Sequence, residues 1–342
     1  MAESGSGVLF IAEVSANHLG SFERAKEIVV AAAKVGANAV KFQTYTAATM
    51  TLDIDNFKVS DDHELWGGRR LYSLYEEAHT PWEWHPELFE LCRTLNVLPF
   101  SSPFDLTAVA FLESLDAPMY KIASLETGDH RLINAVAETG KPLIISTGAT
   151  EWHEIEELVK VVEKAGNKDL TLLVCTSSYP SDPADAHLRR IETLKNRFGV
   201  KVGLSDHTLG IGVSIAAIAL GATVIEKHLT LQRSDGGADG AFSMEPEDFA
   251  GLVKEGNSAA LALGNSHWRM QESEKESRRL RRSLYIVKDV VIGEAVTHEN
   301  VRALRPGDGC APKLLEGMLG MKFVRNLTAG TPMTPELVGV MN

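Results

Sequence analysis

Three short segments of this chain combine lysine, histidine, serine and carboxylate residues, and each completes an apolar run. They are KIASLE (121–126), LSDHT (204–208) and IEKH (225–228). Side chains of these types hold anions, metal ions and protons, so the segments are the first candidates for chemistry. Polar residues that end apolar strands are typical of a (β/α)8 barrel, because its catalytic groups lie at the carboxyl ends of the strands.

Two histidines, His207 and His228, are expected at equivalent depths on neighbouring strands. Neutral imidazoles are common ligands of transition metals, so the pair could bind a divalent ion. Two protein ligands leave coordination positions open, which suits a catalytic ion that acts as a Lewis acid. The alternative is a pair of unrelated histidines, each held by its own hydrogen bonds.

The KIASLE segment brings Lys121, Ser124 and Glu126 to the end of one predicted strand. Lys121 could neutralise a phosphate or carboxylate group, or form a Schiff base if desolvation lowers its pKa. Glu126 could act as an acid, a base or a hydrogen-bond partner. A structural ion pair between the lysine and the glutamate is the alternative to these roles.

Hydroxyl side chains recur after four further strands, and two more polar residues follow the second strand. The set consists of Ser102, Ser146, Ser177, Ser205, Lys41 and Gln43. Hydroxyls and two lysines that converge on one pocket would suit a small, doubly anionic substrate. Each serine alone is more typical of a turn or a helix N-cap, so the repetition carries the argument.

The chain supplies a scaffold that can position these residues. Short β-rich runs are predicted at 8–14, 39–42, 97–100, 119–122, 143–145, 170–174, 200–204 and 223–226. Amphipathic helical patterns such as 22–34 and 151–164 lie between them, and the alternation implies a parallel sheet. We therefore predict a (β/α)8 TIM barrel, an α/β fold, with its functional residues on one face.

Two segments interrupt the alternation, 44–80 and 232–242, and both are expected on the catalytic face. The first contains Trp66, Tyr72 and Tyr75, which favours a folded lid over a simple spacer. We place the barrel at 1–267 and a charge-dense, partly helical linker at 268–281. Short β-rich runs and turns at 282–342 then predict a second domain, small enough to be marginal by itself.

Composition limits the possible partners. The chain has 342 residues, a net charge of −12 and 44% hydrophobic residues, which fits a soluble globular protein without nucleic acid as a general partner. Its cysteines, Cys92, Cys175 and Cys310, are far apart, as is usual in a reducing compartment. No targeting segment and no long apolar run are seen. We expect a cytoplasmic enzyme with no membrane association.

A series of motifs in one order resembles the sialic acid synthase family. The motifs are IAEVSANHLGS, AVKFQTY, FSSPFD, YKIASLE, PLIISTGA, CTSSYP, GLSDHT and IEKHLT. The resemblance runs from Val8 to the C-terminus and implies a C-terminal antifreeze-like (SAF, β-clip) domain. Members of this family are transferases that condense phosphoenolpyruvate with an amino-sugar aldehyde, using Mn²⁺ or Mg²⁺. The products are a nine-carbon nonulosonic acid and phosphate.

Within the family, the chain is most similar to pseudaminic acid synthases. The segments that carry this similarity are CTSSYP, TYTAATMTL (44–52) and LWGGRRLYSLYEEAHTPWEWH (65–85). The sugar implied is 2,4-diacetamido-2,4,6-trideoxy-altrose. The alternative is the same chemistry on another sugar, which would give legionaminic or N-acetylneuraminic acid.

The resemblance also implies roles for individual residues. His207 and His228 would bind the metal. Apart from the resemblance, we expect Glu126 to position or deprotonate a water. Phosphoenolpyruvate would be held by Lys41, Ser102, Lys121, Ser124, Ser146 and Ser205, with Ser177 where many relatives have Asn. The sugar would meet Gln43, Glu126, Tyr179 and Asp239. Arg305, in the RPGDG segment, would reach the active site of the other subunit of a domain-swapped homodimer.

Two other classes of function stay open on the sequence alone. A metal-independent class I aldolase would use Lys121 as a Schiff base rather than as an electrostatic anchor. A carbohydrate-binding or ice-binding module would make the small domain the active part, since SAF domains resemble antifreeze proteins. Such a module would have no need of the paired histidines and lysines on the barrel.

Overall fold

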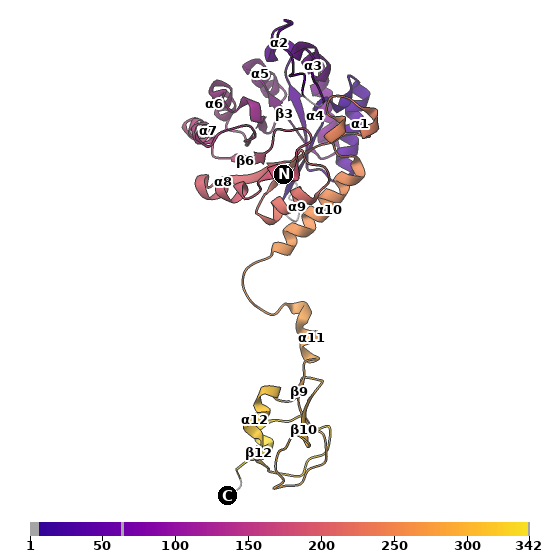
Figure 1. Cartoon of the computed structure of the whole chain (residues 1–342), viewed down its shortest axis with the longest axis vertical. Helices are drawn as coiled ribbons and strands as arrows, with labels where there is room; N and C mark the ends of the chain where they lie inside the picture. The colour runs from indigo at the N-terminus through magenta and orange to yellow at the C-terminus, as the bar shows by residue number, and fades with distance from the viewer. Residues whose placement is uncertain (1–6, 63–64, 341–342) are drawn as a thin grey trace. The chain divides into compact units, whose positions relative to one another are not determined.

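The computed structural model describes residues 7–62 and 65–340 and contains two compact units (Figure 1). The first unit ends at Gly264 and the second begins at Asn265. The division therefore falls three residues before the end that we predicted for the barrel, residue 267.

Strands β1 to β8 of the first unit form a closed parallel barrel in sequence order, in which β1 also pairs with β8. The strands are β1 Leu9–Glu13, β2 Ala39–Thr44, β3 Leu98–Pro103, β4 Tyr120–Ile122, β5 Leu143–Ser146, β6 Leu170–Cys175, β7 Lys201–Ser205 and β8 Val224–His228. The predicted (β/α)8 barrel is confirmed, and every predicted strand end lies within three residues of the observed one.

Helices cover the outside of this barrel (Figure 1). They are α1 Phe22–Lys34, α4 His85–Thr94, α5 Leu106–Ser114, α6 His130–Glu138, α7 Trp152–Lys164, α8 Arg190–Phe198, α9 Gly212–Ala219 and α10 Pro246–Leu263, while α2 Ala47–Met50 and α3 Leu71–Ala78 belong to the long segment after β2. In α1, the Ser21 hydroxyl accepts a hydrogen bond from the Arg24 backbone N–H, which makes it the N-cap. The buried face of the same helix, which includes Ile28 and Val29, contributes to the main hydrophobic core.

An apolar layer fills the interior of the barrel. Its buried members are Ile11, Ala39, Phe100, Met119, Ile144, Leu173 and Val224. Successive side chains of a strand point to opposite faces, so the next inward-facing residue on each strand lies two positions further on. Above this layer, at the carboxyl ends of the strands, the inward-facing residues become polar and form the floor of the site.

The long segment after β2 is folded, and it contains α2 and α3. An isolated antiparallel bridge joins Lys58 to Arg70 within it. The indole N–H of Trp66 donates a hydrogen bond of 3.0 Å to the carbonyl oxygen of Ala238, in the loop after β8. The two segments that interrupt the barrel alternation are therefore in contact with each other.

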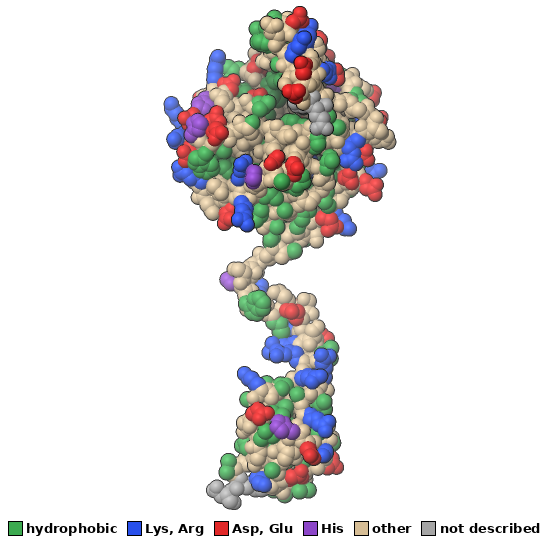
Figure 2. Space-filling view, in the orientation of Figure 1, with side chains coloured by type: hydrophobic (Ala, Val, Ile, Leu, Met, Phe, Trp, Pro, Cys, Tyr) green, Lys and Arg blue, Asp and Glu red, His purple; other side chains and the backbone are tan. Residues whose placement is uncertain are grey.

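The second unit has a hydrophobic core of its own, which includes Leu284, Ile286, Phe323 and Met333. Its elements are α11 Lys275–Arg279, β9 Ser283–Ile286, β10 Val301–Leu304, α12 Leu315–Met318, β11 Lys322–Phe323 and β12 Val338–Gly339. Strands β9 and β10 pair antiparallel, as do β11 and β12. Figure 2 shows Lys and Arg side chains gathered along α11 and the residues after it, where Arg278, Arg279, Arg281 and Arg282 are all exposed.

Among the described residues, no helix is both long enough and apolar enough to cross a membrane.

Candidate active site

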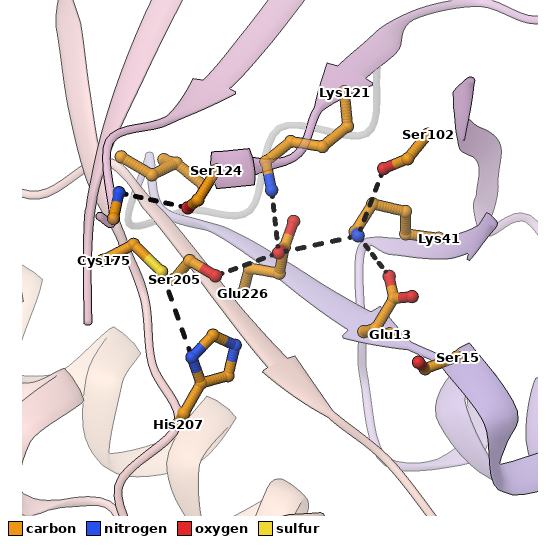
Figure 3. A network of polar contacts seen from close by, with 12 residues as sticks. Glu13, Ser15, Lys41, Ser102, Lys121, Ser124, Cys175, Ser205, His207 and Glu226 are labelled. Atoms are coloured by element: carbon orange, nitrogen blue, oxygen red, sulfur yellow. Dashed lines mark hydrogen bonds and ion pairs between the residues drawn. The ribbon is translucent and has the colours of Figure 1, made fainter. Parts of the chain in front are cut away.

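The polar residues at the carboxyl ends of the strands meet at one level of the barrel (Figure 3). Strand register sets Glu13 of β1 opposite Lys41 of β2 and also opposite His228 of β8. It sets Ser205 of β7 opposite Glu226 of β8, so His207, two residues further on, reaches the level of His228. The equal depth expected for the two histidines is thus present in the structure.

Two lysines and two glutamates form a buried network of alternating charge, which we call the charged half of the site. Lys41 Nζ lies 2.5 Å from Glu13 Oε2 and 3.6 Å from Glu226 Oε1, while Lys121 Nζ lies 3.1 Å from Glu226 Oε1 (Figure 3). Burial lowers the pKa of Lys121. Burial opposes ionisation of Glu226 too, but Lys121 and Lys41 outweigh it and hold the pKa of that carboxyl below its usual range.

The predicted serines surround this network. Ser102 Oγ accepts a hydrogen bond of 3.4 Å from Lys41, and Ser205 Oγ donates one of 3.1 Å to Glu226. Ser124 Oγ accepts from the backbone N–H of Gly148 at 3.1 Å. Ser146 Oγ is buried and has no hydrogen-bond partner among the described residues, so it is open to an incoming ligand.

Gly148 shows how tightly the ends of β4, β5 and β6 converge. A Cβ atom at this position would lie 2.3 Å from Ser177 Oγ, 2.9 Å from Ser124 Oγ and 3.1 Å from Cys175 Sγ. Three side chains thus occupy the space that a Cβ atom at this position would need. Any larger residue would push these hydroxyls apart, which is why glycine is required here.

The rings of His207 and His228 lie 5.4 Å apart and are enclosed by aromatic side chains. The ring of Tyr179 is 4.4 Å from His207, and that of Phe242 is 5.0 Å from His228. His207 Nδ1 is 3.0 Å from the Thr176 carbonyl oxygen, so Nδ1 donates a proton to that carbonyl. Burial opposes the charged form of His207, but the hydrogen bond with Cys175 outweighs it and raises the pKa of His207. Burial, reinforced by His207, holds the pKa of His228 well below its usual value.

This pair of histidines fits an open metal site. His228 Nδ1 is buried and accepts no hydrogen bond within the described part of the chain, and a neutral imidazole is the form that ligates metal. The Thr176 carbonyl fixes the tautomer of His207 as an outer partner of a metal ligand does. No group of three or more His, Cys, Asp or Glu side chains in residues 7–62 and 65–340 has metal-binding geometry. Two nitrogens would therefore be the protein's contribution.

Glu126 closes a short 3-10 turn, Ser124–Glu126, beside the charged half. Burial raises the pKa of its carboxyl to about 7. Its Oε2 atom is buried and has no hydrogen-bond partner among the residues described. A carboxyl that titrates near neutral pH and faces a polar site is suited to proton transfer.

A chain of hydrogen bonds joins Gln43, Ser15 and Asp239, and we call these residues the hydrogen-bonded half of the site. Gln43 Nε2 donates to Ser15 Oγ at 3.0 Å, and the Ser15 hydroxyl donates to Asp239 Oδ2. Tyr179 is linked to this group through Trp66: the two rings are 5.9 Å apart, and the Trp66 indole N–H donates to the carbonyl oxygen of Ala238, next to Asp239. Of the residues predicted to meet the sugar, Gln43, Asp239 and Tyr179 are thus associated in the first unit. Arg305 belongs to the second unit, where it is exposed.

Four residues of the site were missed in the sequence, namely Glu13, Ser15, Cys175 and Glu226. Glu13 and Glu226 could have been found, because each lies on a predicted strand at an inward position beyond the apolar layer. Cys175 Sγ lies 3.9 Å from His207 Nδ1. Burial alone would raise its thiol pKa, but the hydrogen bond with His207 lowers that pKa to about 7. Nothing in the sequence marks Cys175 as close to a histidine.

An ion pair supports the two histidine-bearing strands from their outer side. Lys227 Nζ lies 3.0 Å from Asp206 Oδ2 and donates a hydrogen bond of 2.7 Å to the Thr208 carbonyl oxygen. Ser214 of α9 donates to the same Asp206 oxygen at 2.5 Å. Asp206 and Lys227 each precede one of the histidines, so this buried cluster fixes the spacing between β7 and β8.

The fold and the site define a (β/α)8-barrel enzyme with a charged, hydroxyl-lined cluster at the carboxyl ends of its strands. Residues 28–268 match the NeuB family and residues 281–338 match the SAF domain. The chain belongs to the NeuB family, and its barrel and SAF region agree with the family resemblance of its motifs.

Individual relatives and a solved structure extend this comparison. The chain is 44% identical to the pseudaminic acid synthase of Helicobacter pylori, over 95% of this chain and 96% of that protein. It is 36% identical to the N,N'-diacetyllegionaminic acid synthase of Legionella pneumophila, over 94% and 92%. The crystal structure of N-acetylneuraminic acid synthetase from Leptospira borgpetersenii has a TM-score of 0.71 and 33% identity, covering 79% of this chain and 90% of that one.

Proposed function

We propose that this chain is a pseudaminic acid synthase. It condenses phosphoenolpyruvate with the open-chain form of 2,4-diacetamido-2,4,6-trideoxy-altrose and releases phosphate. The observation that carries the choice of sugar is the identity of 44% with a pseudaminic acid synthase along nearly the whole chain, against 36% with a legionaminic acid synthase. The site chemistry supports the reaction class independently.

Phosphoenolpyruvate binds at the charged half. Lys41 and Lys121 pair with its phosphate and carboxylate groups, and the hydroxyls of Ser102, Ser124, Ser146, Ser177 and Ser205 donate hydrogen bonds to the remaining oxygens. The buried hydroxyl of Ser146, which has no hydrogen-bond partner among the described residues, and the close approach of Ser124 and Ser177 to Gly148 support this assignment. Both lysines act as electrostatic anchors.

His207 and His228 would hold Mn²⁺ or Mg²⁺. The ion supplies Lewis-acid polarisation of the aldehyde oxygen when it is bound. Tyr179 and Phe242 exclude water from this region, because their rings pack directly against the two imidazoles.

The bond changes follow from this arrangement. The methylene carbon of phosphoenolpyruvate forms a bond to the aldehyde carbon, and the aldehyde oxygen gains a proton. A water adds to the former enol carbon, and one of its protons passes to the aldehyde oxygen by way of Glu126. The bond between that carbon and the phosphate oxygen then breaks, and the second proton of the water leaves with the phosphate. Glu126 accepts the proton of the water, a role that suits a carboxyl whose pKa burial raises to about 7.

The enzyme works as a domain-swapped homodimer in which Arg305 completes the site of the other subunit. Arg305 is exposed on its own unit and carries a planar cation suited to an N-acyl oxygen. Mixing two impaired variants tests this directly. Arg305→Ala and His228→Ala chains, unfolded together and refolded, should regain up to a quarter of wild-type turnover, by the statistics of two sites per mixed dimer. If the refolded mixture had no more turnover than the separate variants, the proposal that Arg305 acts in the site of the other subunit would be refuted.

Mass spectrometry of the product is the decisive experiment for the function. The chain is incubated with phosphoenolpyruvate, Mn²⁺ and each candidate aldehyde, and phosphate release is followed. The trideoxy-altrose substrate should give a product enlarged by the pyruvyl carbons, with the highest kcat/KM. Preference for the legionaminic or N-acetylneuraminic precursor would refute the choice of sugar. Trapping of pyruvate on Lys121 by borohydride, with full activity in EDTA, would refute the whole mechanism in favour of a class I aldolase.

A further inference from the structure

Ser15 has an unusual backbone for a residue with a side chain. Its φ of +45° lies in the left-handed region, which favours glycine. The residue follows β1 by two positions, and its side chain is buried, with only 3% of the residue exposed. Strained backbone of this kind persists where surrounding contacts impose it, and it concentrates at functional sites.

The contacts of the Ser15 hydroxyl join two parts of the site that are far apart in the sequence. Its oxygen accepts a hydrogen bond from Gln43 Nε2 of β2, and its proton goes to Asp239 Oδ2 in the loop after β8. The backbone N–H of the next residue, Ala16, donates to the same Asp239 oxygen at 3.1 Å. In Figure 3, Ser15 lies next to Glu13 at the end of β1.

These bonds fix which atoms of Gln43 and Asp239 stay free. The amide nitrogen of Gln43 donates to Ser15 and also to Glu13 Oε1 at 3.2 Å, so both of its N–H groups are used. Asp239 Oδ2 accepts from Ser15 and from Ala16. In the described part of the chain, no protein donor reaches Gln43 Oε1 or Asp239 Oδ1. Two acceptors with fixed directions are therefore presented to a ligand.

We propose that Ser15 is a positioning residue that determines recognition of the sugar. By orienting Gln43 and Asp239, it selects an aldehyde sugar that offers two donors, hydroxyl or amide N–H groups, at matching positions. A diacetamido sugar has such donors. The inference rests on the proposed function, and it adds a residue that acts through the two predicted sugar contacts rather than on the reacting atoms.

Two substitutions separate the hydroxyl from the backbone. Ser15→Gly removes the hydroxyl and relieves the left-handed strain, whereas Ser15→Ala removes the hydroxyl and keeps the strain. Asn96→Gly is the matched control, since Asn96 also has a positive φ, of 58°, but is exposed in the turn between α4 and β3. That turn precedes a strand, so it lies at the end of the barrel away from the site.

KM for each substrate, kcat and the melting temperature are measured for all four proteins. Both Ser15 variants should raise the KM of the sugar by about tenfold or more and leave the KM of phosphoenolpyruvate within about twofold, as expected for the loss of one hydrogen-bonded node. Ser15→Gly should melt at a higher temperature than Ser15→Ala, although the two share the same defect. Asn96→Gly should leave both KM values unchanged.

A Ser15→Gly enzyme with wild-type KM for the sugar would overturn the role of the hydroxyl, because the stable variant cannot fail through misfolding. Equal increases in both KM values would overturn it too, since they would indicate a general loss of structure. The wild-type chain is assayed alongside. If it makes no product from the proposed substrates, the proposed function itself is refuted. If wild type is active and Ser15→Gly has the same KM for the sugar, only the role of Ser15 is refuted.

Discussion

The charged half of the site, around Lys41 and Lys121, and the hydrogen-bonded half, around Ser15 and Asp239, satisfy their buried polar groups in different ways. The first balances two cations against two carboxylates within the barrel. The second uses a hydroxyl to direct one amide and one carboxylate. Ion pairs between lysines and glutamates depend little on direction. A hydroxyl has a single proton, so it fixes which hydrogen bond it donates and which it accepts. The first half therefore suits a substrate defined by charge, and the second suits one defined by the placement of its donors.

The difference has an energetic side. Removing one partner of a buried ion pair leaves an uncompensated charge and destabilises by about 3–5 kcal/mol. Removing one neutral hydrogen-bond partner costs about 1–3 kcal/mol when the other partner is left buried. Substitutions in the charged half should accordingly have larger effects than those in the hydrogen-bonded half. Four experiments, in order of decreasing expected effect, test this comparison.

The largest effect is expected at His228, which lies opposite Glu13 of the charged half in the strand register, with its Nδ1 3.9 Å from Asp239 Oδ2 of the hydrogen-bonded half. His228→Ala should lower metal-dependent kcat by about a thousandfold or more, because the aldehyde would lose its electrophilic activation. Turnover with and without EDTA, together with calorimetric Mn²⁺ binding, is the measurement. His153→Ala, on the exposed face of α7, is the control and should bind Mn²⁺ like wild type. Full activity of the His228 variant in EDTA would remove the metal from the mechanism.

Lys121→Met should break the charged half. We expect kcat/KM for phosphoenolpyruvate to fall by about a hundredfold to a thousandfold, equivalent to about 3–4 kcal/mol, with little change in the KM of the sugar. Steady-state kinetics with each substrate varied in turn gives both values. Lys201→Met removes an exposed lysine that pairs with Asp169 at the other end of the barrel, and it should have no effect on kinetics. A larger change for the sugar than for phosphoenolpyruvate would reverse the assignment of the two halves.

Glu126→Gln should change the pH dependence. The folded carboxyl has a pKa of about 7, above the ordinary value of 4.5, so the folded state binds more protons than the unfolded state between these values. Stability from this group is therefore present below pH 4.5 and is lost as the pH rises through 7. The variant should gain melting temperature relative to wild type at pH 8 but not at pH 4.5, while kcat falls about 10–100-fold. Glu157→Gln, on the surface of α7, controls for loss of charge. If the difference in melting temperature between the variant and wild type were the same at pH 8 and at pH 4.5, burial of an ionisable Glu126 would be contradicted.

The smallest effect is expected for Trp66→Phe, next to the hydrogen-bonded half. This change keeps an aromatic ring near Tyr179 but removes the N–H that donates to the Ala238 carbonyl. Loss of one hydrogen bond at the loop that carries Asp239 should raise the KM of the sugar about two- to fivefold. Trp268→Phe, at a fully exposed tryptophan, is the control. A greater effect than that of Ser15→Gly would show that the lid, not the hydroxyl, dominates recognition.

The sequence allowed the barrel and the two lysines of the charged half to be predicted, because both depend on strand periodicity. Once the strands are placed, inward positions beyond the apolar layer follow, as they do for Lys41, Lys121 and His228. Ser15 could not be predicted, since its role depends on a positive φ that serine rarely adopts. The proximity of Cys175 to His207 depends likewise on how two strand ends converge. Residues whose positions follow from strand periodicity can be predicted from the sequence, whereas residues whose roles depend on loop geometry cannot.

The ion pair between Asp206 and Lys227 bears on enzyme engineering. Both residues alternate along the chain with site residues, yet they contact α9 and the Thr208 backbone instead of the substrate side. Grafting His207 and His228 onto another barrel without this outer cluster would transfer the ligands but not the distance between them. A library that aims at new sugar acceptors should therefore hold Asp206, Lys227 and Ser214 constant and vary the loops after β1, β2 and β8.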